Sequence, residues 1–432
     1  MNKWTALRAL RPLAVILALA IPVLAQTSAA DIETLKKTAP KIYIACSRCD
    51  IEYIKTEITF VNYVRDRKEA QVHVLITTQY TGSGGTEYTL AFSGQHEFQG
   101  IDDTVRCFAN MTDTKDEVRQ GLVNTLKMGL MSYVARTPIS QRVGLTFAAP
   151  EKSEIFHDKW KFWVFSLSFN GYFSGETSYS RHFWGTNLSA NKVTPDIKIR
   201  LGLSADYEGE SYLYEDETTT SNQEEYEFDG LVVKSLNEHW SVGGYLAASS
   251  SSYENIRFQV SPGPAIEYNV FPYSQSTRRQ LRLLYKLSFE AVRYRAETIY
   301  NRTRQNLLKE SLSANLSVKE KWGSISLSLS GSHYFHDLSK YQLNLWGGIQ
   351  LQLFKGLSAF VNGGGSWIHD QLNLIKGDAT LEEILLRRRE LATTYNYFVG
   401  FGLSYTFGSI YTNVVNPRFG SVGGGGVSIN ID

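Results

Sequence analysis

Apolar side chains recur at every second position through most of the chain between residues 162 and 407. The last repeat, residues 394–407, shows the pattern most completely. Its even positions are small or polar except Phe398, and its odd positions are Tyr395, Tyr397, Val399, Phe401, Leu403, Tyr405 and Phe407. Because successive side chains of a β-strand point to opposite faces, this pattern predicts a strand with one apolar and one polar face. Fourteen residues is long for a soluble strand, and aromatic residues at both ends of the apolar face are typical of a membrane-spanning strand.

Twelve such segments can be counted, near residues 162–174, 180–193, 196–209, 225–236, 239–250, 255–271, 278–293, 304–319, 322–335, 340–354, 357–371 and 393–407. Short connections alternate with mostly longer ones. The short ones are 194–196, 237–239, 271–277, 320–322 and 355–356, and the longer ones are 207–225, 251–255, 294–304, 334–340 and 372–392. Short turns on one side of a membrane and longer loops on the other are typical of outer-membrane barrels. The chain is therefore predicted to form an all-β transmembrane antiparallel barrel of about twelve strands. Its last strand should pair with the first, near residues 163–173.

The N-terminus has the pattern of a secretory signal peptide. Lys3, Arg8 and Arg11 precede an apolar run at residues 13–24, and small residues follow it. We predict a signal peptide at residues 1–25, with cleavage as late as residue 30 as the alternative. The apolar run is short for a transmembrane helix. Lys plus Arg number 44 and Asp plus Glu number 43, so no bulk attraction to nucleic acid is expected.

Residues 38–149 are predicted to form a small α+β domain. Strand-like runs lie at 42–45, 54–64, 71–80 and 87–98, with a glycine-rich turn at 82–85 and a last strand at 142–147. Thr114 and Glu117 have the spacing of a helix capping box, and Leu122, Leu126, Gly129 and Tyr133 then share one helical face. Residues 150–161 read as a linker, 162–408 as the barrel and 409–432 as a C-terminal tail.

Cys46 and Cys49 are close in sequence, and Cys107 is the third cysteine. In an exported protein this pair favours a structural disulfide, with free thiols or redox chemistry as the alternatives. A metal site would need a second pair of ligands, so neither a metal nor a cofactor is predicted.

Charged residues fall on the polar faces of the predicted strands. The lumen-lining candidates are Lys198, Arg200, Asp206, Arg257, Glu267, Arg282, Lys286 and Glu290. They can be read as a selectivity lining, but we favour a paired network that fills a narrow barrel, because buried charge is costly unless partnered.

Two predicted external loops have a biased composition. Residues 208–229 carry nine carboxylates and no Lys or Arg, which predicts a solvated loop, with divalent-cation binding at the lipopolysaccharide surface as the alternative. Residues 372–392 predict a short helix over the barrel mouth, with the arginines at 387–389 facing the acidic loop or anionic lipid.

The chain is not expected to be an enzyme. A lipid-cleaving barrel would need a serine and a histidine within hydrogen-bond reach on the outer face at the rim. The best candidate is His333 with Ser332 and Ser330, and no nucleophile-elbow pattern is found.

The pattern Gly400-x-Gly402-x-x-Tyr405-x-Phe407 resembles the terminal signal by which outer-membrane barrels are recognised for assembly. Residues 162–407 also resemble uncharacterised Gram-negative outer-membrane β-barrel proteins of about twelve strands, some with an added periplasmic domain. This resemblance implies an outer-membrane location with the N-terminal domain in the periplasm, contact with lipid and lipopolysaccharide, and recognition by the barrel-assembly machinery. It implies no catalytic residues. In the family the signal usually ends the chain, whereas here residues 409–432 follow, either hanging in the periplasm or folding into the lumen as a plug.

Three functions follow as hypotheses. The preferred one is passage or binding of a small solute by the barrel, with a periplasmic domain that docks a protein partner or peptidoglycan. The second is a non-conducting structural or envelope-assembly protein anchored by its barrel. The third is a hydrolase at the rim.

Overall fold

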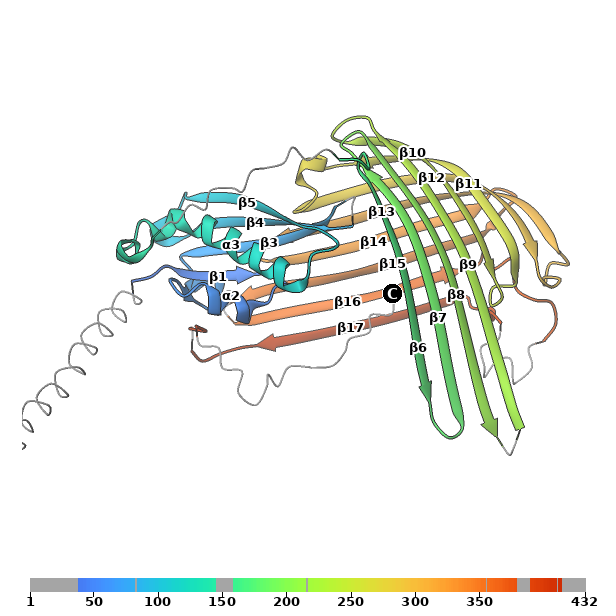
Figure 1. The fold of residues 1–432 in the computed structure, drawn as a ribbon. Helices are drawn as coiled ribbons and strands as arrows, with labels where there is room; N and C mark the ends of the chain where they lie inside the picture. The colour runs from blue at the N-terminus through green and yellow to red at the C-terminus, as the bar shows by residue number, and fades with distance from the viewer. Residues whose placement is uncertain are drawn as a thin grey trace, which may run out of the picture.

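The computed structural model describes residues 38–81, 84–144, 158–214, 217–354, 356–378, 389–409 and 411–413. A small N-terminal domain lies at one end of a large, strongly curved sheet (Figure 1). The predicted signal peptide, most of the linker, residues 379–388 of the predicted loop helix and the tail after residue 413 lie outside the described residues. Among the described helices, none is long and apolar enough to cross a membrane.

The N-terminal domain is a five-stranded sheet with its helices packed on one face. The sheet order is β2-β1-β3-β4-β5, with β1 parallel to both β2 and β3 and the other pairs antiparallel. The elements in chain order are β1 (Lys41–Ala45), α2 (Ile51–Glu57), β2 (Asn62–Tyr63), η1 (Arg67–Glu69), β3 (Val72–Tyr80), β4 (Thr86–Gly94), η2 (His96–Phe98), β5 (Asp102–Ala109), α3 (Lys115–Val134) and η3 (Pro138–Arg142).

The strand predicted at 54–64 is wrong, because the chain forms helix α2 there and only the two-residue strand β2. Ile51, Ile54 and Ile58 recur at helical spacing, and the last two are fully buried in the core. The side chain of Asp50 accepts a hydrogen bond of 2.9 Å from the backbone N–H of Tyr53 and so begins the helix. The strand predicted at 142–147 is also not formed at its start, since Arg142 ends η3.

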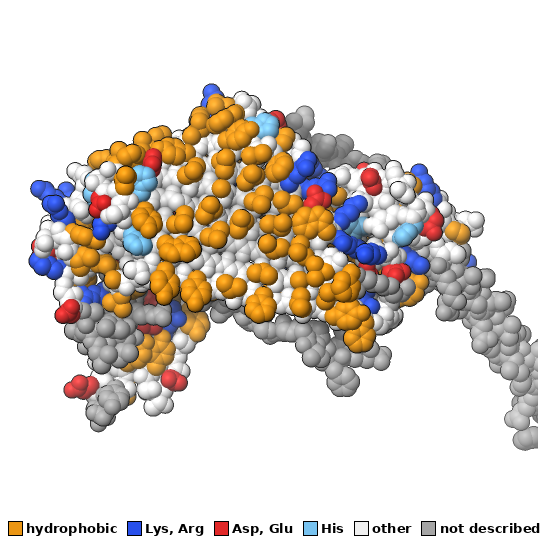
Figure 2. All heavy atoms as spheres, turned by 180° about the vertical axis from the view of Figure 1, so that it is seen from behind, with side chains coloured by type: hydrophobic (Ala, Val, Ile, Leu, Met, Phe, Trp, Pro, Cys, Tyr) orange, Lys and Arg blue, Asp and Glu red, His pale blue; other side chains and the backbone are white. Residues whose placement is uncertain are grey.

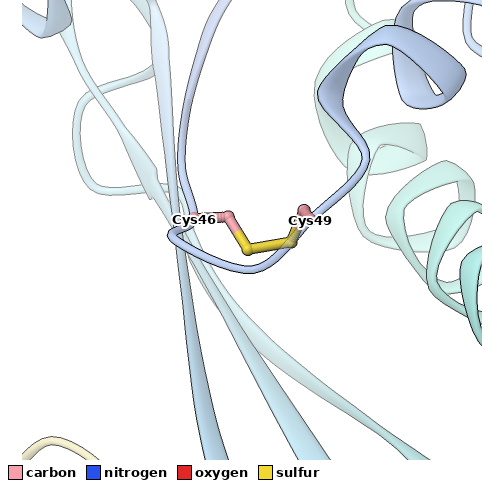
Figure 3. The surroundings of a disulfide bond; sticks show 2 residues. All are labelled: Cys46 and Cys49. Carbon is pink, nitrogen blue, oxygen red and sulfur yellow. A yellow bond between two sulfur atoms is a disulfide. The ribbon is translucent and has the colours of Figure 1, made fainter. Parts of the chain in front are cut away.

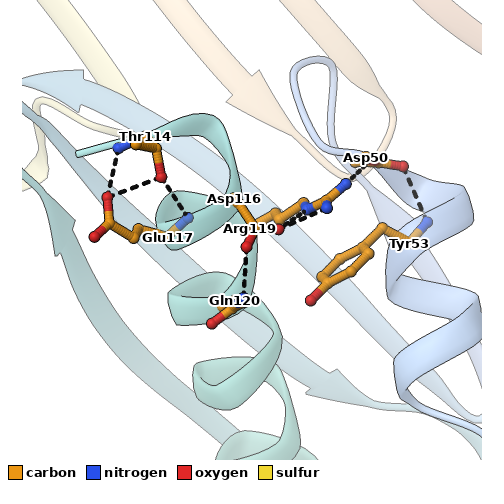
Figure 4. A network of polar contacts seen from close by, with 7 residues as sticks. All are labelled: Asp50, Tyr53, Thr114, Asp116, Glu117, Arg119 and Gln120. Atoms are coloured by element: carbon orange, nitrogen blue, oxygen red, sulfur yellow. Dashed lines mark hydrogen bonds and ion pairs between the residues drawn. The ribbon is translucent and has the colours of Figure 1, made fainter.

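Helix α3 begins with the predicted capping box. Thr114 accepts from the backbone N–H of Glu117, and the Glu117 carboxylate accepts from the backbone N–H of Thr114 at 2.7 Å (Figure 4). Arg119 joins α3 to α2, since its guanidinium lies 4.1 Å from the Tyr53 ring centre and 3.5 Å from the Asp50 carboxylate. The predicted apolar face of α3 is buried against the sheet.

The second part of the chain is a twelve-stranded antiparallel sheet, so the predicted fold class is confirmed in strand number and direction. Each strand pairs with its neighbours in the sequence, and β6 and β17 lie at the two ends of the order. The strands are β6 (Trp163–Gly175), β7 (Tyr179–Val193), β8 (Ile197–Tyr214), β9 (Glu217–Ser235), β10 (Trp240–Ser251), β11 (Ile256–Asn269), β12 (Arg279–Tyr294), β13 (Arg304–Glu320), β14 (Gly323–Tyr334), β15 (Asp337–Phe354), β16 (Leu357–Ile368) and β17 (Tyr395–Tyr405); a 3-10 turn, η4 (Tyr273–Gln275), joins β11 to β12.

The pairing predicted between the last and first strands is not found. Within the described residues β17 pairs only with β16, and β6 pairs only with β7. Strands β6–β9 cross the direction of β13–β17 at a steep angle, which leaves the sheet curved but unclosed (Figure 1). Alternation specifies the faces of a strand but not the curvature that brings two distant edges together.

Two loop predictions are also wrong. The acidic segment 208–229 belongs mostly to strands, because β8 continues to Tyr214 and β9 begins at Glu217. The neighbouring strand β7 supplies partners that the segment itself lacks: Arg181 lies 2.6 Å from the Glu208 carboxylate, and the Tyr179 hydroxyl donates to Glu210 at 2.8 Å. The connection predicted at 334–340 is a two-residue turn, 335–336.

The convex face of the large sheet is broadly apolar. Figure 2 shows hydrophobic side chains across its middle and charged side chains gathered toward its two ends. On the edge strands these side chains are highly exposed, with 73% of Leu167 and 80% of Phe401 accessible to solvent. The face matches the odd positions read in the sequence for 394–407, so the alternation assigned the sides of the strand correctly.

Candidate functional site: the concave face of the sheet

Seven of the eight lumen-lining candidates lie on the concave face. The strand registers alternate them with the outward apolar residues, as at Lys198 and Arg200 on β8 and Arg282 and Lys286 on β12. Arg257 is the exception. It lies where the β11–β12 register shifts, is exposed, and lines neither of the two concave cavities described below.

One polar cluster lies toward the short-turn end of the concave face. Arg282 lies 3.5 Å from the Glu267 carboxylate. Lys198 is near enough to interact electrostatically with both residues of this pair and with Arg200. Tyr273, from the turn between β11 and β12, donates a 2.6 Å hydrogen bond to Glu267. Sequence reasoning missed Tyr273, since nothing about a tyrosine in a turn indicates that it folds back over the sheet.

A second cluster lies toward the opposite end and lines a cavity of about 280 Å³. The Tyr334 hydroxyl donates to Glu290 at 3.1 Å, and the Lys309 ammonium lies 3.2 Å from Asp370 and 4.8 Å from the Tyr334 ring centre. The segment after β16 brings Asp370 to this cavity, and the loop between β10 and β11 brings Glu254.

The Glu254 carboxyl is affected by its surroundings. Loss of hydration at the cavity wall, together with the neighbouring carboxylates Glu390, Glu225 and Glu227, raises the pKa of Glu254, although part of this residue is exposed to solvent. Sequence reasoning missed Glu254, Asp370 and Glu390, because loop residues carry no periodicity that would assign them to a face. It also missed Lys309 and Tyr334, which lie on strands β13 and β14.

A third group of polar residues forms a second cavity of about 370 Å³ beside the first. Lys286 extends over the Tyr245 ring, with its ammonium 4.9 Å from the ring centre. Hydroxyl groups from three adjacent strands form much of the remaining wall: Ser288, Ser311, Ser313, Ser330 and Ser332. Glu290 and Lys309 also line this cavity, so it combines many weak hydrogen-bond donors and acceptors with charges of both signs.

The candidate pair for rim hydrolysis is separated by the sheet. Ser330 and Ser332 line the concave cavity, whereas His333 is the next residue along the strand and therefore faces outward. There His333 Nε2 lies 2.7 Å from the Glu310 carboxylate, which also accepts a 2.5 Å hydrogen bond from the Tyr285 hydroxyl. These serines and His333 therefore do not form a hydroxyl–imidazole pair.

The residues of the resembled assembly signal lie on β17 and just beyond it. A side chain at Gly402 would collide with the ring of Phe360, and one at Gly400 would lie 2.9 Å from the Asn362 side-chain oxygen. Tyr405 and Phe407 face outward, and their ring centres are 5.6 Å apart. The glycines therefore make room for concave-face side chains of β16, while the two aromatic rings stay accessible.

Cys46 and Cys49 are joined by a disulfide (Figure 3). The bond closes the turn between β1 and α2, and Cys107 on β5 is a free, partly buried thiol. Among the described residues, no group of three or more His, Cys, Asp or Glu side chains is arranged to hold a metal ion.

Comparison with known proteins gives structural likeness only. Neither a model of a known protein family nor a curated protein sequence matches the chain. Among solved structures, the chain is similar to the NanC porin, with 11% identity, 56% of this chain and 99% of that chain covered, and a TM-score of 0.27. It is also similar to the β domain of the Bordetella autotransporter BrkA (11% identity, 57% and 98% covered, TM-score 0.25) and to the translocator domain of the autotransporter NalP from Neisseria meningitidis (10% identity, 57% and 87% covered, TM-score 0.19).

Proposed function

We propose that this chain is an outer-membrane β-barrel protein that binds or passes small polar solutes, with its N-terminal domain in the periplasm. The observation that carries the proposal is the opposite character of the two faces of one twelve-stranded sheet. The convex face is apolar and exposed, while the concave face holds charged side chains, serines and two cavities. Strands of outer-membrane barrels alternate in this way, with apolar side chains toward lipid and polar side chains toward the interior.

The position of the N-terminal domain supports its assignment to the periplasmic side. The domain lies at the ends of β13–β17, where the connections 321–322 and 355–356 are short (Figure 1). Outer-membrane barrels keep short turns on the periplasmic side. An N-terminal signal peptide, as the sequence predicts, would deliver the chain to that compartment.

Reconstitution of the full chain tests passage. We expect discrete conductance steps in planar bilayers, and swelling of proteoliposomes in a neutral monosaccharide, a zwitterionic amino acid or a monocarboxylate. Lys286→Glu should shift ion selectivity toward cations, because it reverses a charge on the concave face. The matched control Leu345→Val, on the convex face, should leave selectivity unchanged. An inserted protein that neither conducts nor binds any of the three probe solutes would rule the proposal out.

A second candidate, a non-conducting structural or assembly protein anchored by its sheet, is favoured by one observation. Trp346, Phe360 and Phe398 lie on the concave face of β15–β17, where they would occupy interior space. Crosslinked envelopes from cells with and without residues 31–150 test it. Loss of co-purifying envelope proteins on deletion supports this candidate, and an unchanged set of partners counts against it.

A further inference from the structure

Three consecutive residues of the N-terminal domain contact three separate parts of the large sheet. They are Arg65 and Asp66, which lie between β2 and η1, and Arg67, the first residue of η1. The Arg65 guanidinium donates to the carbonyl oxygens of Phe407 and Gly408 at 3.0 and 3.2 Å, just past the end of β17.

The other two residues reach neighbouring turns. The Asp66 carboxylate accepts a 2.9 Å hydrogen bond from the backbone N–H of Gly356, in the turn between β15 and β16. Arg67 donates to the carbonyl oxygen of Lys321, between β13 and β14, and at 3.5 Å to that of Gln352. Hydrogen bonds with one charged partner are stronger than neutral ones. These three residues therefore attach the N-terminal domain firmly to the large sheet.

The chain that follows β17 makes a second attachment. Tyr411 forms an antiparallel bridge with Val64, and the backbone N–H of Thr412 donates to the Tyr63 carbonyl at 3.0 Å. Asn413 accepts from the Tyr63 N–H at 2.6 Å and donates to the Asn62 side chain at 2.9 Å. Residues 411–413 therefore extend the domain's sheet at its β2 edge, as a peptide added by β-augmentation does.

The face of the domain sheet that carries no helix lies toward the short-turn end of the large sheet. Its residue His73 stacks on Tyr43 and is only 1% exposed, with Lys321 close enough to affect it electrostatically. At the other side of this face, the Ser276 hydroxyl donates to Gln79 at 3.3 Å. The contacts thus run from the β11–β12 turn to the end of β17.

We propose that the N-terminal domain is a gate seated on the inner rim of the sheet. Arg65, Asp66, Arg67 and residues 411–413 form its latch, a name used here for these six residues. The inference rests on the proposed function, since a gate matters only if solute passes. In the seated position the domain occupies the inner end of strands β11–β17, so a solute crossing the interior meets it. The latch uses a few side chains and one short strand, so the domain can leave the rim without unfolding.

Disulfide formation between two introduced cysteines in the full chain shows directly whether the domain contacts the rim. Gln79→Cys with Ser276→Cys, in a Cys107→Ser background, places two thiols at the present contact between domain and turn. We expect rapid disulfide formation with an intact latch, and at least tenfold slower formation when Arg65→Ala and Arg67→Ala are added. Lys115→Ala with Lys127→Ala removes two positive charges from α3 and is the matched control, for which the rate should not change.

Conductance measurements on the same variants test the gate separately from the proposed function. Arg65→Ala/Arg67→Ala should conduct more than the parent, and the oxidised cysteine pair should conduct less than its reduced form. Equal conductance in all forms, or unchanged crosslinking in the latch variant, would overturn the gate while leaving solute passage standing. If no form conducts, including the latch variant, then both the gate and passage fail.

Discussion

The backbone N–H of Tyr63 donates a 2.6 Å hydrogen bond to the side chain of Asn413, 350 residues further along the chain. This contact joins the edge of the N-terminal sheet to the segment that follows the last strand of the large sheet. In the predicted tail, residues 411–413 pair with the N-terminal domain. They neither extend freely into the periplasm nor enter the concave interior. The first and last described parts of the chain are therefore packed together.

Replacing Asn413 tests this contact. Asn413→Ala removes an acceptor for the Tyr63 N–H and a donor to Asn62, which should cost about 1–2 kcal/mol of local stability. Hydrogen–deuterium exchange of residues 60–66 should accelerate correspondingly. Asn124→Ala, at an exposed position of α3, is the control and should leave that exchange unaltered. Unchanged exchange in Asn413→Ala would mean that the tail does not pair with β2 in solution.

Replacing each of two glycines of α3 with alanine should change the stability of the domain in opposite directions. A side chain at Gly129 would collide with the Phe92 ring, whereas one at Gly121 meets no heavy atom within 4 Å. Gly129→Ala should destabilise the domain by about 1–3 kcal/mol, because overpacking outweighs the gain in helix propensity. Gly121→Ala should stabilise it by up to about 1 kcal/mol. Pulse proteolysis of residues 38–144 in urea measures both, and equal responses would contradict the packing of α3 on β4.

His73 should make the N-terminal domain sensitive to acid. Burial, followed by the positive charges of Lys321 and Arg67, lowers the pKa of His73 from 6.5 to about 4. The folded state therefore keeps the ring neutral while the unfolded chain takes up a proton. The stabilisation is complete above pH 6.5 and is lost as the pH falls toward 4, with about 2 kcal/mol lost by pH 5.

The variant His73→Phe keeps an aromatic ring beside Tyr43 but cannot bind a proton. Its unfolding free energy, measured by pulse proteolysis between pH 7.5 and 5, should fall less than that of the parent. His96→Asn, at an exposed histidine, should retain the parent's pH dependence. An identical slope in His73→Phe would show that another group causes the acid sensitivity.

Thiol counting tests the disulfide. Alkylation of the unfolded protein without reductant should modify one cysteine, Cys107, and alkylation after reduction should modify three. Because the bond closes a very short loop, Cys46→Ser with Cys49→Ser should cost roughly 2 kcal/mol. Three reactive thiols before reduction would mean that the bond is not formed in the exported protein.

The two unpaired edges of the large sheet should meet in a bilayer. Unpaired backbone groups in hydrocarbon are costly, and β6 and β17 both present apolar residues on the convex side. Leu167→Cys should form a disulfide with Phe401→Cys, or with a cysteine two residues to either side, only after membrane insertion. Leu167→Cys with Leu345→Cys, on distant strands, should not react. Absence of any β6–β17 crosslink in the inserted protein would favour a different closure of these edges.

Sequence patterns predicted best where the determining interaction is local. The alternation identified all twelve strands, and the spacing of Thr114 and Glu117 identified the start of α3, because a strand's faces and a helix cap depend on residues close in the chain. The segment around Ile54 was assigned to a strand although its isoleucines have helical spacing. The β8–β9 hairpin was missed because partners for two of its carboxylates, Glu208 and Glu210, come from the neighbouring strand β7, which the segment itself does not reveal.

By itself, the sequence determined the number of strands, which side of each is apolar, and therefore which charges share the concave face. Period-two alternation is a property of the chain, so it survives whatever shape the sheet takes. Only the tertiary structure decided that Glu254 and Asp370 meet Glu290 at one cavity. The same is true of the hydrogen bond from Arg65 to the chain just past β17. The tertiary structure also left β6 and β17 unpaired with each other among the described residues. Such contacts depend on curvature and loop direction summed over the whole sheet, and no local pattern encodes either.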